Sequence, residues 1–108
     1  RYSSHCLRDN GAEGLTVNTG NDKLYVSGIT FGNANNECGN GIVYIGNPSS
    51  STFSTTFNIL NSNMDNEGRS STCNTGGVWT TTTAVNGIQF FFSSGNVDAG
   101  VFKLYGIS

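Results

Sequence analysis

The sequence has little charge, little proline and no long apolar run. Charged residues make up 11% of its 108 residues and proline occurs once, whereas about a quarter of a typical soluble domain is charged. The five basic residues are scattered, so no patch could neutralise several phosphates or lie on anionic lipid. No run of 18 or more apolar residues is present, which excludes a membrane-spanning helix. We therefore expect neither a nucleic acid partner nor membrane insertion.

Cysteine is also scarce, with three residues at Cys6, Cys38 and Cys73. An odd number cannot all pair within one chain, so the sequence allows one disulfide with one free thiol, or three free thiols. No two cysteines lie within four residues of each other, which excludes zinc-ribbon spacing. The remaining metal alternative is a zinc site built from His5 and the three cysteines. We expect instead buried or half-buried thiols, a surface histidine, no metal and no cofactor.

Small polar residues replace the missing charge. Gly, Asn, Ser and Thr account for 55 of the 108 residues, and 12 residues are aromatic. So many aromatic residues indicate a chain that packs rather than a disordered one. Because the chain starts with Arg1, we expect a processed product or the C-terminal part of a longer protein.

Runs rich in Val, Ile, Thr, Phe and Tyr and bounded by Gly and Asn predict strands. These runs are Leu15–Asn18, Lys23–Phe31, Gly41–Ile45, Thr52–Leu60, Val78–Thr83, Asn86–Ser93 and Val101–Ile107. The clearest alternation places Phe53, Phe57 and Ile59 on one face and Ser54, Thr56 and Asn58 on the other. The expected turns are Asn10-Gly11, Asn40-Gly41 and Asn86-Gly87. The sequence therefore predicts one all-β domain over residues 1–108, an antiparallel, jelly-roll-like β-sandwich of about seven to eight short strands with long polar loops.

Two long polar stretches, Gly32–Asn40 and Asn61–Gly77, are predicted to be loops. Long loops on a rigid sandwich commonly carry binding sites. The candidate ligand-binding residues are Asn35, Asn36, Asp65, Asn66, Arg69 and Trp79. The alternative for Trp79 is a place in the core. Residues 61–68 also resemble part of a calcium loop, but they lack its closing glutamate and its glycine at the sixth position, so we expect an Asx-rich turn.

Catalysis finds little support in the sequence. His5 is the one histidine, and no Gly-x-Ser-x-Gly elbow accompanies it. Asp65 and Glu67 lie two residues apart in a predicted loop, where we expect both to be solvated, whereas paired carboxylates of glycoside hydrolases face each other across a cleft. We expect no catalytic residue and no enzymatic activity.

The last predicted strand is apolar on both faces. Its large side chains are Phe102 and Leu104 on one face and Val101, Tyr105 and Ile107 on the other. One set should fill the sandwich core, and a loop or another subunit should cover the other set. On this basis, deleting Val101–Ser108 is expected to abolish folding, whereas Gly and Ser residues in place of Asp65–Arg69 should leave the fold intact.

The segment NGIQFFFSSGNVDAGVFKLYGI, from Asn86 to Ile107, resembles a C-terminal signature of tailed-bacteriophage virion proteins. In that signature a strand with the pattern I-x-F/I-x-x-S-S-G-N precedes a terminal strand with the pattern x-F-x-L-Y-G-I. The rest of the chain resembles the family only in its β-rich, Asn-, Ser- and Thr-rich character. Domains of this family are β-sandwiches of tail fibres, head fibres and capsid decoration proteins, and the signature marks a structural module rather than a chemical site.

The resemblance implies a non-catalytic structural protein of the virion surface, extracellular when released. It would act in particle assembly and in adhesion to the host surface. Its implied partners are other copies of itself, with a trimer favoured, other virion proteins and a host-surface glycan. The alternative hypothesis is a carbohydrate-binding or lectin-like β-sandwich module outside a phage, and a small hydrolase is the third hypothesis.

Overall fold

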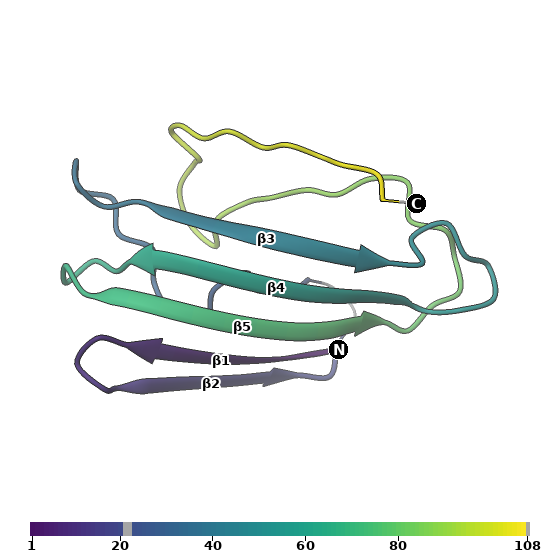
Figure 1. Cartoon of the computed structure of the whole chain (residues 1–108), viewed down its shortest axis with the longest axis horizontal. Coiled ribbons are helices and arrows are strands. Elements are labelled where there is room, and N and C mark those ends of the chain that lie inside the picture. The colour runs from purple at the N-terminus through teal and green to yellow at the C-terminus, as the bar shows by residue number, and fades with distance from the viewer. Residues whose placement is uncertain (21–22, 108) are drawn as a thin grey trace.

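The computed structural model describes residues 1–20 and 23–107, and this part of the chain is all-β (Figure 1). Five strands form one antiparallel sheet in the order β2-β1-β5-β4-β3. Their bounds are β1 Tyr2–Arg8, β2 Glu13–Asn18, β3 Gly39–Gly46, β4 Thr55–Met64 and β5 Ser70–Trp79. The predicted all-β class and antiparallel pairing are confirmed. The predicted seven to eight strands are too many for the described residues, which form five strands in a single sheet.

Two hairpins and one long-range pairing build the sheet. The β1–β2 hairpin turns at the predicted Asn10-Gly11 pair, where Gly11 has a φ of 81°. The β4–β5 hairpin turns over residues 65–69. β1 pairs with β5 along its whole length, which joins the N-terminal hairpin to the rest of the sheet. The predicted turn at Asn40-Gly41 is wrong, because both residues lie inside β3.

The two faces of the sheet differ in what covers them. Alternate side chains of β1, β4 and β5 are buried on one face, which we call the inner face. On β4, Ile59 is buried at 2% exposure, whereas its neighbours Asn58 and Leu60 point to the opposite side and are exposed. We call that opposite side the open face, since none of the residues that the structure describes crosses it in Figure 1. The predicted alternation is therefore confirmed within β4, but it is wrong for Phe53, which lies before the strand and is 68% exposed.

The inner face is lined largely by small polar side chains. Its buried polar residues are Ser4, Thr55, Asn61, Asn63, Asp65, Ser71 and Thr75. Two of these residues pair across neighbouring strands: Thr75 Oγ1 donates a hydrogen bond to Ser4 Oγ at 2.8 Å, and Ser71 Oγ donates to the carbonyl oxygen of Asn63 at 3.2 Å. Buried polar groups are tolerated when they are hydrogen-bonded. This pairing lets a strand as poor in large apolar residues as β5 lie in the middle of the sheet.

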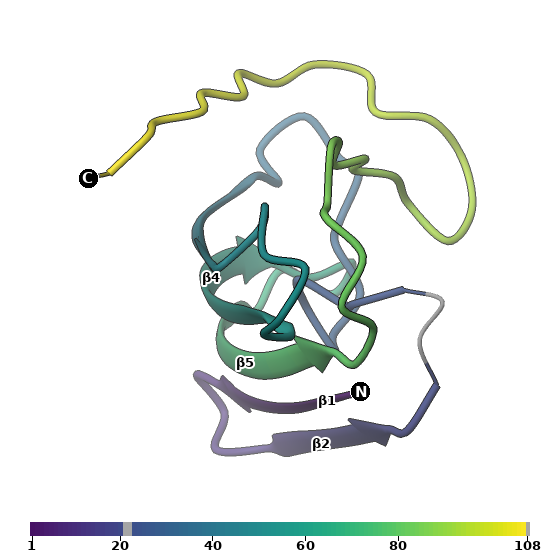
Figure 2. The same cartoon turned by 90° about the vertical axis from the view of Figure 1, so that its right-hand side faces the viewer.

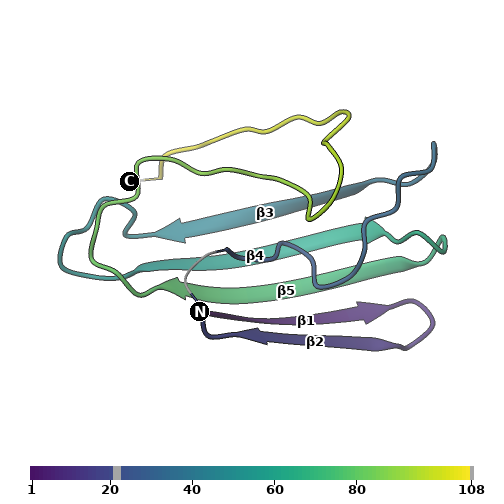
Figure 3. The ribbon, with the colours of Figure 1, turned by 180° about the vertical axis from the view of Figure 1, so that it is seen from behind.

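Residues 23–31 cross the inner face instead of adding a strand, so the predicted strand Lys23–Phe31 is wrong (Figure 3). Ile29 is 6% exposed and packs against the two cysteines of the inner face. Ser27 Oγ donates to the carbonyl oxygen of Ile29 at 2.9 Å and to Asn63 Oδ1 at 3.3 Å. Asn63 Nδ2 in turn donates to the carbonyl oxygen of Thr30 at 3.3 Å. Hydrogen bonds to side chains of the sheet thus hold this segment in place, instead of the backbone hydrogen bonds of a paired strand.

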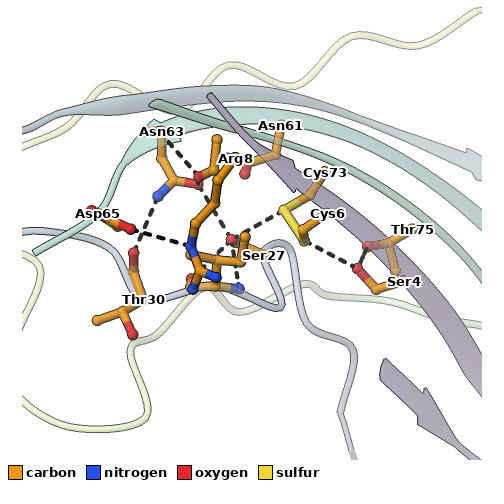
Figure 4. The surroundings of a disulfide bond; sticks show 12 residues. Ser4, Cys6, Arg8, Ser27, Thr30, Asn61, Asn63, Asp65, Cys73 and Thr75 are labelled. Atoms are coloured by element: carbon orange, nitrogen blue, oxygen red, sulfur yellow. Dashed lines mark hydrogen bonds and ion pairs between the residues drawn. A yellow bond between two sulfur atoms is a disulfide. The ribbon is translucent and has the colours of Figure 1, made fainter. Parts of the chain in front are cut away.

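One disulfide joins the two central strands (Figure 4). Cys6 of β1 and Cys73 of β5 are directly opposite in the register, with their Cα atoms 4.1 Å apart, and both are fully buried. Cys38 is a free, exposed thiol. Of the two alternatives that the odd cysteine count allowed, the structure contains the one with a single bridge.

Residues 80–107 contain no strand or helix. The predicted strands Asn86–Ser93 and Val101–Ile107 are therefore wrong, and of Val78–Thr83 only the first two residues belong to β5. The N–H of Val85 donates to the carbonyl oxygen of Pro48 at 2.6 Å, which fixes the start of the segment. The chain then runs along the molecule, turns, and returns past the β3 edge (Figures 1 and 2).

Candidate functional site

The predicted binding residues fall at two ends of the sheet. Met64 accepts a hydrogen bond from the N–H of Gly32 and donates one to the carbonyl oxygen of Cys38, both at 2.9 Å. These bonds place the loop over residues 32–38 beside the β4–β5 turn. Asn35 and Asn36 therefore lie at the same end of the sheet as Asp65, Asn66 and Arg69. Trp79 is half-buried and lies at the opposite end of β5 (Figure 1).

Asp65 is a buried residue and not the solvated loop residue that we predicted (Figure 4). Its side chain is 1% exposed. Oδ1 accepts hydrogen bonds from the backbone N–H groups of Glu67 at 2.9 Å and Arg69 at 3.0 Å. Oδ2 lies 2.8 Å from Nε of Arg69 and 3.3 Å from Nε of Arg8. One carboxylate therefore holds the turn closed and ties it to the end of β1.

The predicted loop Asn61–Gly77 is in fact most of the β4–β5 hairpin. Asn61 and Asn63, which could have served as calcium ligands, lie in β4 with their side chains buried. Asn61 Nδ2 donates to the carbonyl oxygen of Asn40 at 3.1 Å, so its amide is part of the β3–β4 contact. The expected turn is confined to residues 65–69, where Gly68 adopts a φ of 74° in a loop geometry common for hairpins.

The ionisation of Asp65 follows from its surroundings. Burial alone would raise the pKa of this carboxyl group, because it removes water from the carboxylate. Hydrogen bonds from the backbone N–H groups of Arg69 and Glu67, together with the Arg69 guanidinium, outweigh burial and lower the pKa from 3.8 to about 2. The hydrogen bond to Asp65 also raises the pKa of Arg69. The ion pair is therefore fully charged near neutral pH.

We expect acid to weaken the fold through Asp65. Since the folded pKa lies below the unfolded value of 3.8, the carboxylate contributes stability that is complete well above pH 3.8 and is lost as the pH falls toward 2. The urea midpoint, measured as a function of pH, should fall over this interval in the parent protein. Asp65→Asn should have a lower midpoint at neutral pH and a smaller fall in acid. The matched control is Asp98→Asn, at an exposed carboxylate, which should behave like the parent. An Asp65→Asn profile parallel to that of the parent would contradict the assignment.

The described residues offer few groups for chemistry. No three His, Cys, Asp or Glu side chains of residues 1–20 and 23–107 are grouped so that they could hold a metal ion. His5 lies on β1, and its Nε2 is 3.8 Å from Oε1 of Glu13, with both side chains more than half exposed. In the same part of the chain no helix is long and apolar enough to cross a membrane.

Residues 101–107, which we call the C-terminal arm, expose all of their large apolar side chains. The exposed fractions are 82% for Val101, 62% for Phe102, 85% for Leu104, 73% for Tyr105 and 86% for Ile107. We predicted that one face of this segment fills the core, and that prediction is wrong, because the arm adds to no ladder and neither face is buried. Contiguous exposed apolar surface of this kind typically marks an interface.

A second apolar surface, on the open face, was missed in the sequence. β2 places Leu15 and Val17 there at 75% and 76% exposure. β3 adds Ile42 and Tyr44, and β4 adds Leu60, each about half exposed. The alternation of these residues predicts a shared face, but it does not tell which face of the sheet the chain covers. The structure answers that question, because residues 23–31 cover the other side.

No protein-family model, no curated protein and no solved structure matches the chain. The features that point to a function are therefore the chain's own: an apolar C-terminal arm that is exposed, an apolar open face, and a cluster of loop asparagines at one end of the sheet.

Proposed function

We propose that this chain is a non-catalytic structural domain of a virion surface protein, of the capsid-decoration, head-fibre or tail-fibre kind, which acts by associating with copies of itself. The observation that carries the proposal is the C-terminal arm, whose five large apolar side chains are 62–86% exposed. Fully burying one such side chain contributes roughly 1.5–3 kcal/mol, so an association that covers the arm is favoured. The signature shared with tailed-bacteriophage virion proteins supports the virion part of the proposal.

We propose that the jelly-roll-like sandwich forms only when copies associate, with the second layer supplied by another copy. A single sheet with an uncovered apolar face is half of a sandwich. The segment over residues 86–107 has the alternation of two strands, and its two limbs run in opposite directions, with the rings of Phe90 and Phe102 stacked at 5.0 Å. Such a ribbon carries an apolar face that could form the second layer.

The exposed asparagines supply the adhesive part of the proposal. Asn35, Asn36 and Asn66 are exposed at one end of the sheet, whereas Asp65 and Arg69 are engaged with each other. Amide side chains of this kind can donate to and accept from the hydroxyl groups of a host-surface glycan. The location that follows is the virion surface, with the chain extracellular when released.

Two measurements test the proposal. Light scattering on the purified protein should give a multiple of the 11.4 kDa chain mass, with three copies favoured. An antibody raised against the purified chain should label, in electron microscopy, the surface of particles of the phage that encodes the chain. A protein that stays monomeric at high concentration and labels no particle contradicts the proposal. Binding to a glycan array by such a monomer would favour the carbohydrate-binding alternative.

A further inference from the structure

A shallow groove runs along the open face, over β1 and β5 and beside β2. Two adjoining hollows form it, and they share Ser3, Val17 and Gly76. The floor is low because Gly76 has no side chain, and a Cβ atom placed there would meet no atom within 4 Å. Leu15, Val17 and Val78 form the apolar walls. We call this feature the groove.

The groove suits an extended segment in direction and in length. It follows β5 from Asn74 to Val78, which is roughly 13 Å at about 3.3 Å per residue. Five extended residues of the C-terminal arm span the same distance. Phe102 and Leu104 lie at alternate positions of the arm and are 62% and 85% exposed, and the open space above Gly76 leaves room for an apolar side chain.

The arm and the groove of one copy lie at opposite edges of the molecule. In Figures 1 and 2 the C-terminal arm passes the β3 edge, whereas β1 and β2 lie at the other edge. A second copy can therefore present its arm to the groove without any rearrangement of the sheet.

We infer that the C-terminal arm of one copy lies in the groove of the next copy, in a head-to-tail contact. This inference rests on the proposed function and names the two surfaces that carry the self-association. Because arm and groove are different surfaces, each copy has one of each to offer. A contact of this type closes into a ring when the rotation between neighbours permits, which accommodates a trimer.

The first experiment compares three variants by light scattering at one protein concentration. Val17→Asp places a charge in the groove, and Leu104→Asp places one on the arm; both positions are highly exposed, so the monomer should still fold. We expect both variants to have the mass of a single chain. Phe53→Asp is the matched control, since Phe53 is 68% exposed but lies outside the arm and the groove, and it should keep the mass of the parent. Circular dichroism spectra that match the parent show that each variant is folded.

The second experiment mixes the two monomeric variants in equal amounts. Val17→Asp retains an intact arm, and Leu104→Asp retains an intact groove. The mixture should therefore form one contact and give a dimer, but no larger species, because the second contact would join the two altered surfaces. Each variant alone should stay monomeric at the same total concentration.

A third variant, Gly76→Val, keeps the test independent of added charge. It fills the groove with a branched side chain where the monomer has open space, so it should also dissociate the assembly. If the parent is oligomeric and all three variants keep its mass, the head-to-tail inference is wrong while the proposed function stands. If the mixture of Val17→Asp and Leu104→Asp stays monomeric, the inference is likewise overturned. A parent that is itself monomeric overturns the inference, and it overturns the proposed function as well when the antibody labels no particle.

Discussion

Replacing Cys6 and Cys73 together by serine should lower the free energy of unfolding by about 4 kcal/mol. The bridge joins residues 67 positions apart, and closing a loop of that length in the unfolded chain contributes about 4 kcal/mol at 25 °C in the chain-entropy treatment of disulfides. A typical domain is stable by roughly 5–15 kcal/mol. This bridge also lies where β1 pairs with β5, which among the described residues is the strand pairing that joins the N-terminal hairpin to the rest of the sheet. The variant should therefore retain only a small margin of stability.

Urea denaturation with and without a reducing agent measures this effect. The reducing agent should lower the urea midpoint of the parent toward that of the double variant and should leave the double variant unchanged. Cys38→Ser is the control, because this exposed thiol is outside the bridge and its replacement should not move the midpoint. Equal midpoints for the oxidised and reduced parent would show that the bridge does not stabilise the fold.

The strands that could be predicted from the sequence are those that contain large apolar residues, either alternating with polar ones or in a short continuous run. β2 and β3 were predicted close to their observed bounds, and the centre of β4 was predicted from Phe57 and Ile59. In β2 and at the centre of β4 the alternation of apolar and polar side chains matches the period of a strand, whereas β3 contains the continuous apolar run Ile42–Ile45. The signal is local, so it needs no knowledge of the partner strand.

β1 and β5 could not be predicted in the same way. The residues of β5 that face inward include Ser71, Cys73 and Thr75, which look like loop residues in the sequence. They are compatible with burial only because β1 and β4 supply hydrogen bonds and a disulfide from positions far away in the chain. The burial of Asp65 has the same origin, since one of its two guanidinium partners, Arg8, belongs to β1.

In the C-terminal segment, by contrast, the sequence predicts a strand that the structure does not contain. Residues 101–107 have the alternation and composition of a strand, yet the single chain offers them no ladder. A strand exists only as a member of a pair, so its sequence pattern describes what a segment can do when a partner is present. The groove offers the arm of another copy an apolar sheet face and not a ladder edge, so it accounts for the apolar alternation of the segment and not for a paired strand.

The largest effect on the fold is expected from the β4–β5 turn, and the largest effect on assembly from the C-terminal arm. This reverses the expectation from the sequence, in which the arm was essential for folding and the turn was dispensable. Gly and Ser residues in place of Asp65–Arg69 remove the carboxylate that binds two backbone N–H groups and two guanidinium groups, and leave Arg8 beside the turn without its carboxylate partner. We expect this variant to be unfolded, or to show only a weak cooperative transition in thermal melting.

Deleting residues 101–108 should have little effect on the sheet, because none of the described residues of the arm belongs to a strand or lies in the buried core. The truncated protein should melt within a few degrees of the parent and have the mass of a single chain. Replacing only the exposed pair Asn66 and Glu67 by serine tests the turn more gently, since the backbone N–H groups that bind Asp65 remain, and this variant should melt close to the parent. Thermal melting and light scattering on the three variants separate the two roles. If the truncated protein fails to fold, the arm is part of the folding core. If the variant with Gly and Ser at residues 65–69 is stable and folded, the buried carboxylate does not hold the hairpin together.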